Sequence, residues 1–183
     1  MKYVEMKVKI QPKERFGAKL LVEGNDDQHV VWAICEKYKI TETFDVVDCK
    51  GISQILERLP VDLKQEGVTT IGILVDADQD LQKSWQSLFD RLSPYGYTIP
   101  VDPSPDGFIH LPHDIYPSIG IWLMPDNLQS GMLEDFMRLL IRTDDLLRPF
   151  VEQSLSQIER QAIASRYEPV HRAKAFIHTW LAW

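Results

Sequence analysis

The stretch "LLVEGNDDQHVVW", Leu20–Trp32, decides the fold because it joins two apolar elements through a short acidic segment. The apolar run Ala18–Val22 has the length and composition of a buried parallel strand. After Asp26, apolar residues recur at helical spacing as far as Tyr38. Asn25 or Asp26 is expected to cap this helix. A strand followed so closely by a helix is typical of the repeating unit of α/β proteins.

The same alternation continues along the chain and predicts the fold class. Apolar patterns predict further strands at Tyr3–Ile10, Phe44–Asp48, Thr69–Asp76, Phe108–Leu111 and Ile119–Met124. Helical spacing predicts helices at Gly51–Leu59, Ser84–Leu92, Gly131–Ile141, Leu146–Ile163 and Val170–Leu181. We therefore expect an α/β fold with a central, mainly parallel sheet, helices on both faces and extra C-terminal helices. We expect one domain over residues 1–183, with a core at about 18–140 and a helical extension at 141–183.

The composition narrows the class of protein. The 183 residues carry a net charge of −7, which argues against simple nonspecific binding to nucleic acid. The first twenty residues and the last twenty-four are nevertheless basic, and the middle is acidic. Cys35 and Cys49 form no disulfide framework. The N-terminus does not resemble a signal peptide, and no apolar run approaches the ~20 residues that cross a membrane. We expect a cytoplasmic protein with no membrane partner.

Acidic side chains follow three of the predicted strands, at the point where each strand ends. They are Glu23 and Asp27, Asp48, and Asp76 and Asp78. Because the carboxyl ends of parallel strands meet at one edge of the sheet, we expect these side chains to lie close together. Carboxylates that converge in this way repel one another unless a cation neutralises them, and hard oxygen ligands suit Mg²⁺ or Mn²⁺. Two such ions would support in-line displacement at phosphorus.

At this point the sequence resembles a known family. "LLVEGNDD", followed some fifty residues later by "GILVDADQD", is similar to the Toprim domain of topoisomerases, primases and OLD-family nucleases. Glu23 and Gly24 match its first motif, and Asp76 and Asp78 match its second. "DCKGIS" (residues 48–53) resembles the second strand end of the family. The closest likeness is to OLD-family nucleases and to small stand-alone Toprim-like proteins of undefined function.

The resemblance implies roles for individual residues. Glu23, Asp76, Asp78 and Lys50 would be catalytic, and Gly24, Gly51 and Lys50 would contact the substrate. The metal ligands would be carboxylates from four segments: Glu23, Asp27, Asp48, Asp76, Asp78 and Glu134. Arg172 and Lys174 are further candidates, beside Lys50, for a basic residue near the metals.

The function that these expectations indicate is divalent-metal-dependent phosphoryl transfer, as a Toprim-type nuclease acting on phosphodiesters. The chain lacks the tyrosine domain of a topoisomerase and the zinc pattern of a primase. The motifs also fit a dehalogenase-type phosphatase, a receiver domain or a dinucleotide fold poorly. A noncatalytic Toprim module that binds a protein or nucleic acid stays open. The partners that these expectations suggest are nucleic acid and a second copy of the chain.

Several conspicuous residues also have plain structural interpretations. Asp26 is expected to favour the first turn of its helix, where acidic side chains complement the helix dipole. Asp80 is either a ligand or a solvated loop residue. The spacing of His110 and His113 would allow both to bind a transition metal, but such a pair also arises by chance in a proline-rich loop.

Overall fold

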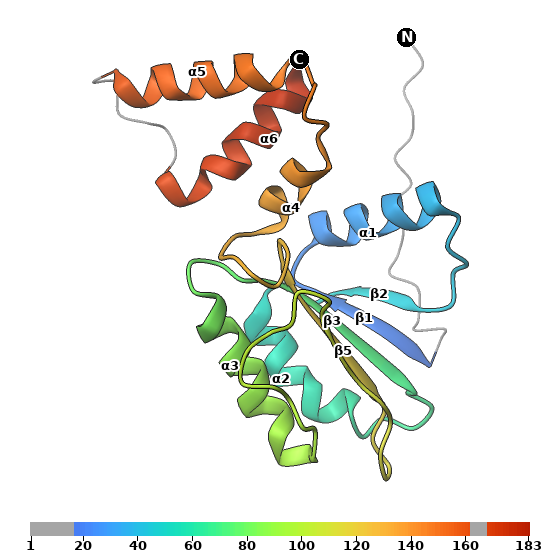
Figure 1. The fold of residues 1–183 in the computed structure, drawn as a ribbon. Coiled ribbons are helices and arrows are strands. Elements are labelled where there is room, and N and C mark those ends of the chain that lie inside the picture. The colour runs from blue at the N-terminus through green and yellow to red at the C-terminus, as the bar shows by residue number, and fades with distance from the viewer. Residues whose placement is uncertain (1–16, 162–167) are drawn as a thin grey trace.

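The computed structural model describes residues 17–161 and 168–183, so the predicted strand Tyr3–Ile10 lies outside the described residues. Strands and helices alternate through most of the chain (Figure 1). The strands are β1 (Ala18–Val22), β2 (Asp45–Asp48), β3 (Thr70–Asp76), β4 (Phe108–His110) and β5 (Ser118–Met124). The helices are α1 (Asn25–Tyr38), α2 (Ile52–Asp62), α3 (Leu81–Leu92), α4 (Leu133–Leu140), α5 (Arg148–Arg160) and α6 (Arg172–Ala182), with short 3₁₀ turns at Ser93–Tyr95 and Pro169–His171.

The five strands form one sheet in the order β2-β1-β3-β5-β4. Only β4 runs antiparallel, so the predicted α/β class with a mainly parallel sheet is confirmed. Val22 is in register with Asp48 of β2 and Leu74 of β3, and Asp76 is in register with Met124 of β5. The carboxyl ends of β2, β1, β3 and β5 therefore meet at one edge of the sheet.

Helices cover both faces of the sheet, as expected (Figure 1). Alternate residues of β3 point to opposite faces. Ile71 and Ile73 belong to a core shared with Ile55 of α2 and Leu88 of α3. Leu74 belongs to a second core, on the other face, to which residues of β1, α1, β5 and α4 contribute. The two apolar faces explain why the buried strands carry near-continuous hydrophobic sequences.

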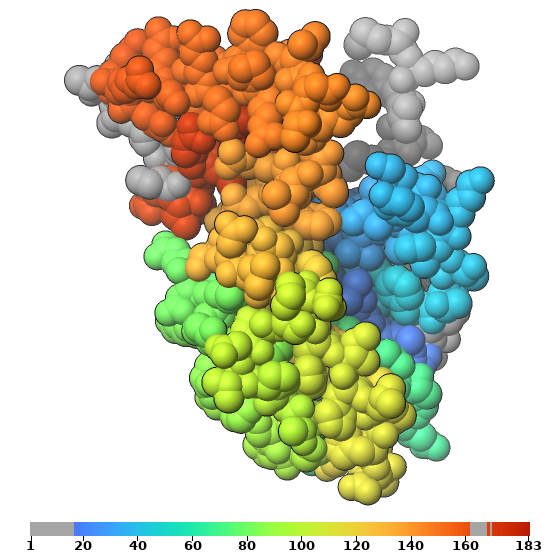
Figure 2. Space-filling model, in the orientation of Figure 1, coloured from blue at the N-terminus to red at the C-terminus, as the bar shows by residue number. Residues whose placement is uncertain are grey.

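The C-terminal helices have a core of their own. Val151 and Leu155 of α5 pack against Phe176 and Ile177 of α6, together with Ile141. Ion pairs around this core also join the helices. Arg138 of α4 pairs with Glu152 of α5, and Arg172 of α6 pairs with both Glu152 and Glu159 of α5. Figure 2 shows these helices, orange to red, gathered at one end of the molecule. None of the described helices is both long and apolar enough to span a membrane.

Several predicted helix boundaries were wrong, including the start of α3 at Leu81 rather than Ser84, and two of the differences have a clear physical cause. The helix expected to end before Pro60 runs on to Asp62, because Leu59 is anchored in the core and proline's fixed φ is itself helical. The first helix is capped by Gly24 rather than Asn25 or Asp26. Asp27, at the third position of this helix, reaches back to accept a hydrogen bond from the Gly24 N–H (3.0 Å), which fixes the start at that residue.

Two substitutions in α2 should separate core packing from helix propensity. Leu59 is fully buried, whereas Val61 is 70% exposed. Leu59→Ala should lower the free energy of unfolding by about 2–5 kcal/mol because it leaves a cavity in the core. Val61→Ala should change it by less than ~0.5 kcal/mol. Urea titrations of both variants measure this, and equal losses would contradict the assigned packing of α2.

Candidate functional site

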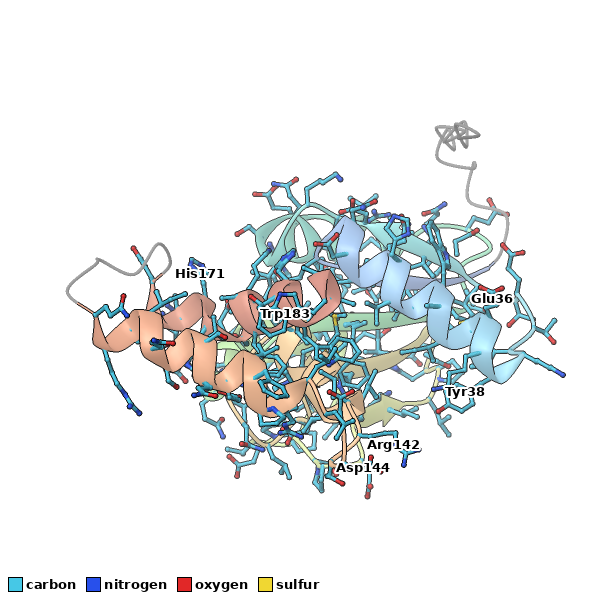
Figure 3. The ribbon with its side chains drawn as sticks, turned by 90° about the horizontal axis from the view of Figure 1, so that it is seen from above. Glu36, Tyr38, Arg142, Asp144, His171 and Trp183 are labelled. Atoms are coloured by element: carbon cyan, nitrogen blue, oxygen red, sulfur yellow. The ribbon has the colours of Figure 1, made fainter. Side chains whose placement is uncertain are left out.

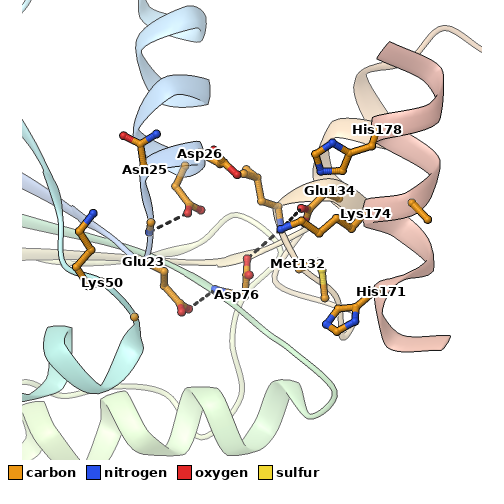
Figure 4. A pocket seen from close by; sticks show the side chains of 15 residues that line it. Glu23, Asn25, Asp26, Lys50, Asp76, Met132, Glu134, His171, Lys174 and His178 are labelled. Carbon is orange, nitrogen blue, oxygen red and sulfur yellow. Dashed lines mark hydrogen bonds and ion pairs between the residues drawn. The ribbon is translucent and has the colours of Figure 1, made fainter. Parts of the chain in front are cut away.

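A cavity of about 840 Å³ lies at the edge of the sheet where the parallel strands end (Figure 4). Five segments line it: the β1–α1 turn, the β2–α2 turn, the end of β3, the start of α4, and α6 with the residue before it. The lining residues are Glu23, Gly24, Asn25, Asp26, Asp27, Lys50, Gly51, Asp76, Met132, Leu133, Glu134, His171, Lys174, Ala175 and His178. The sequence motifs and the C-terminal helices thus meet in one place.

The carboxylate of Glu23 joins three of these segments. Its Oε1 accepts a hydrogen bond from the Asp76 N–H (2.8 Å), and its Oε2 accepts one from the Ile52 N–H (3.2 Å). Burial raises the pKa of Glu23, and the negative charges of Asp78 and Asp27 raise it further, against the lowering effect of the two hydrogen bonds. Each oxygen keeps a second lone pair, so Glu23 can still bind a cation.

Asp76 is the most strongly perturbed carboxyl group in the cavity. Burial is the first cause that raises its pKa to about 8, and the charges of Glu23, Asp27 and Asp78 add to it. One hydrogen bond opposes this shift, from the Leu133 N–H to Oδ1 (2.9 Å) at the start of α4. The carboxylates of Glu23, Asp27 and Asp78 thus lie close enough to Asp76 to repel it.

Asp27 lines the cavity and has a buried carboxylate oxygen. Its Oδ2 accepts the Gly24 N–H, whereas its Oδ1 is buried and has no hydrogen-bond partner. The residue as a whole is only 7% exposed. Burial raises the pKa of Asp27, as do the charges of Glu134 and Asp26. A buried carboxylate oxygen without a partner is costly, and a cation or an ordered water would satisfy it.

Glu134 also reaches the cavity, where the resemblance placed it. Its side chain is 12% exposed, and its Oε1 lies 3.6 Å from Nζ of Lys174 on α6. The α4 helix therefore contributes a carboxylate beside those of β1, α1 and β3, although it follows them by more than fifty residues in the chain.

Two predicted ligands do not line this cavity. Asp48 is buried at the end of β2, where its carboxylate pairs with the Lys50 ammonium and accepts the Lys50 N–H (3.0 Å). Asp78 is exposed, with φ 53°, and its backbone bonds to Gly131 in both directions. The charge of Asp78 nevertheless raises the pKa of both Glu23 and Asp76.

The two predicted glycines have different structural reasons, close contact at Gly24 and backbone conformation at Gly51. A Cβ atom at Gly24 would lie 3.3 Å from Oδ2 of Asp27, against the hydrogen bond that starts α1. Gly51 has φ 112°, a conformation that favours glycine, and its N–H donates to the Glu23 carbonyl (2.7 Å). Both residues line the cavity, and Gly51 ties the β2–α2 turn to the end of β1.

Four other candidate residues have structural roles. Asp80 caps α3 by accepting the Lys83 N–H (3.0 Å). Arg172 forms ion pairs with α5 and does not line the cavity. His110 and His113 contact each other, with ring centroids 4.9 Å apart, and both rings pack against Tyr97.

The sequence interpretation missed the two histidines on the α6 side of the cavity, His171 and His178. Their spacing to Lys174, three and four residues, is the only sequence signal that they share a helix face. Nothing in the local sequence indicates that this face meets the strand ends.

The carboxylates are near one another but are not arranged as a closed ligand set. In residues 17–161 and 168–183, no group of three or more histidine, cysteine or acidic side chains is placed to hold a metal ion. The chemistry of the cavity still suits a hard cation, because oxygen donors dominate and Asp27 Oδ1 has no partner.

Comparison with known proteins places the chain in a family. Residues 17–183 match the model of a family described as "Protein of unknown function (DUF3226)", and the chain belongs to that family. No curated protein and no solved structure matched the chain. The family description names no activity, so any function must be inferred from the cavity itself.

The pKa of Asp76 predicts how stability depends on pH. The folded protein keeps this proton up to pH about 8, while the unfolded chain releases it near pH 3.8. The stability gained from the protonated group is complete below pH 3.8 and is lost as the pH rises through about 8. Asp76→Asn, which mimics the protonated acid, should therefore be more stable than wild type at alkaline pH and less dependent on pH.

Urea midpoints measured from about pH 5 to about pH 9 without divalent cations test this prediction. The matched control, Asp90→Asn, removes an exposed carboxylate from α3 outside the cavity. A pH dependence in Asp76→Asn equal to that of wild type and control would show that Asp76 ionises as it does in the unfolded chain.

Proposed function

We propose that the protein is a divalent-metal-dependent phosphoryl-transfer enzyme, and specifically a Toprim-type nuclease that cleaves nucleic-acid phosphodiesters. One observation carries this proposal. Glu23, Asp27 and Asp76 have raised pKa values and line one cavity, and Asp27 has a buried carboxylate oxygen without a hydrogen-bond partner. A cation would relieve both the repulsion and the missing interaction.

The ligand set favours Mg²⁺ or Mn²⁺. Glu23, Asp27 and Asp76 would hold the ion, with Glu134 as a further oxygen donor from α4. The side chains do not enclose an ion by themselves, and Mg²⁺ typically keeps several waters and is completed by substrate phosphates. An open carboxylate cluster beside a wide cavity is therefore compatible with a cation that binds together with its substrate.

The remaining residues suggest how the site would support the reaction. When bound, the cation would polarise the phosphoryl group and activate a water molecule. Two backbone hydrogen bonds hold the Glu23 carboxylate in place, so its orientation is fixed before substrate arrives. Lys50 stays fastened to Asp48, so we assign it to the wall of the cavity rather than to the reacting phosphate.

The Toprim resemblance, which comes from the sequence, supports the same proposal. Its two motifs, "VEG" at Val22–Gly24 and "DAD" at Asp76–Asp78, follow β1 and β3, which are neighbours in the sheet. Adjacent parallel strands whose ends carry acids are the arrangement that a shared metal site requires.

Removal of two carboxylates tests the metal site and the activity together. Wild-type protein should bind Mn²⁺ in calorimetric titrations and should cleave labelled single-stranded DNA, double-stranded DNA or RNA only when Mg²⁺ or Mn²⁺ is present. Glu23→Gln combined with Asp76→Asn should weaken Mn²⁺ binding by more than about tenfold and abolish cleavage, because both ligands lose their charge.

The control for this experiment is Glu36→Gln, which removes a carboxylate at the far end of α1 (Figure 3). It should bind Mn²⁺ and cleave as wild type does. Equal Mn²⁺ affinity in wild type and the double variant would overturn the metal site. Mn²⁺ binding without cleavage of any nucleic acid would instead favour the noncatalytic binding module.

A further inference from the structure

The α6 helix and the residue before it, His171, present three nitrogen-bearing side chains to the cavity. His171, Lys174 and His178 line it from the side opposite Glu23 and Lys50 (Figure 4). The spacings of three and four residues place them on one face of the helix. This side of the cavity is therefore rich in hydrogen-bond donors, while the strand ends and α4 supply carboxylates.

The other faces of α6 have different partners, which sets this face apart. Ala173, Phe176 and Ile177 are buried in or beside the C-terminal core. Arg172 is held by Glu152 and Glu159 of α5. Packing and ion pairing thus account for these four residues, but they do not require cationic or imidazole side chains on the cavity face.

The ion pair between Lys174 and Glu134 leaves the Lys174 ammonium group accessible. Its Nζ lies 3.6 Å from Glu134 Oε1, longer than the ~3.2 Å upper range of a hydrogen bond, and the side chain is 49% exposed. The ammonium group can therefore contact a ligand while it remains near the carboxylate cluster. His171 and His178 are likewise exposed, one on each side of Lys174 along the helix.

We infer that His171, Lys174 and His178 form a phosphate-binding row that holds the backbone of a single nucleic-acid strand beside the carboxylate cluster. The inference rests on the proposed function, because it assigns the substrate of that same cavity. Lysine and imidazole N–H groups are suitable donors to phosphate oxygens. An imidazole can also stack on an unpaired base.

The length of the row favours a strand over a mononucleotide. Its ends, His171 and His178, are seven positions apart, which corresponds to about 10 Å along a helix axis at a rise of ~1.5 Å per residue. A single phosphate group would occupy only part of this length, whereas a stacked strand places a phosphate about every 3.4 Å along its axis. The row can thus contact two or three successive phosphates.

Electrostatics explain why the cavity needs such a row. The protein carries a net charge of −7, and several of its carboxylates gather at the strand ends, so a polyanion would be repelled from the cavity even after one cation binds. Positive charge and N–H donors on the opposite wall would offset this repulsion at the point where the strand enters. The C-terminal helices would then be a substrate-binding element rather than an appendage to the sheet.

Fluorescence anisotropy with a short oligodeoxythymidylate tests the inference, using the full chain with Ca²⁺ in place of Mg²⁺. Lys174→Ala should weaken binding about five- to tenfold and should lower the slope of log K against log salt by ~0.7, because one phosphate contact is lost. His171→Ala combined with His178→Ala should also weaken binding. The control Lys37→Ala removes an exposed lysine from the last turn of α1 and should bind as wild type does.

Other outcomes would overturn the inference in distinguishable ways. Unchanged affinity and salt slope in the α6 variants, with Mn²⁺ binding intact, would remove the phosphate-binding row and leave the metal site standing. Thymidine monophosphate that competes as strongly as the oligonucleotide would replace the strand with a mononucleotide. If the wild-type protein does not bind Mn²⁺, the proposed function is wrong. The α6 variants would then still decide, by anisotropy, whether the row binds a strand.

Discussion

The structure of the cavity depends on one side chain, the Glu23 carboxylate, which connects the ends of neighbouring elements. It accepts the N–H groups of Asp76 at the end of β3 and of Ile52 at the start of α2. Both contacts are possible because β1 lies between β2 and β3 in a parallel sheet, so the three segments end at one edge. With Glu23 fixed there, Asp76 and Asp27 are brought into mutual repulsion within a partly buried space.

This clustering of carboxyl groups lowers the stability of the folded protein, which indicates that the cluster has a functional role. Burial and repulsion raise the pKa of all three carboxyl groups, and Asp27 keeps one buried oxygen without a partner. A carboxylate cluster that served only the fold would gain from replacement by apolar or amide side chains. The cost is intelligible if the cluster binds a cation, and perturbed groups of this kind concentrate at functional sites.

The sequence predicted the parts of this site that depend on local structure. Glu23 and Asp76 follow strongly apolar strands, and their positions come from strand length and the parallel topology. Asp48 and Asp78 also stand at or after strand ends, but the side chain of Asp48 is paired with Lys50, and Asp78 is exposed, with its backbone paired to Gly131. His171 and His178 could not be predicted, because the packing of α4, α5 and α6 decides which face of α6 meets the cavity.

A crystal structure with Mn²⁺, with the ion located by anomalous scattering, tests the central claim most directly. A Mn²⁺ peak within ~2.0–2.6 Å of carboxylate oxygens of Glu23, Asp27 or Asp76 would support a shared metal site. The account predicts that Asp27 Oδ1 is among the ligands, directly or through one bound water. The absence of any Mn²⁺ in the cavity under saturating conditions, with the three carboxylates placed as described, would contradict it.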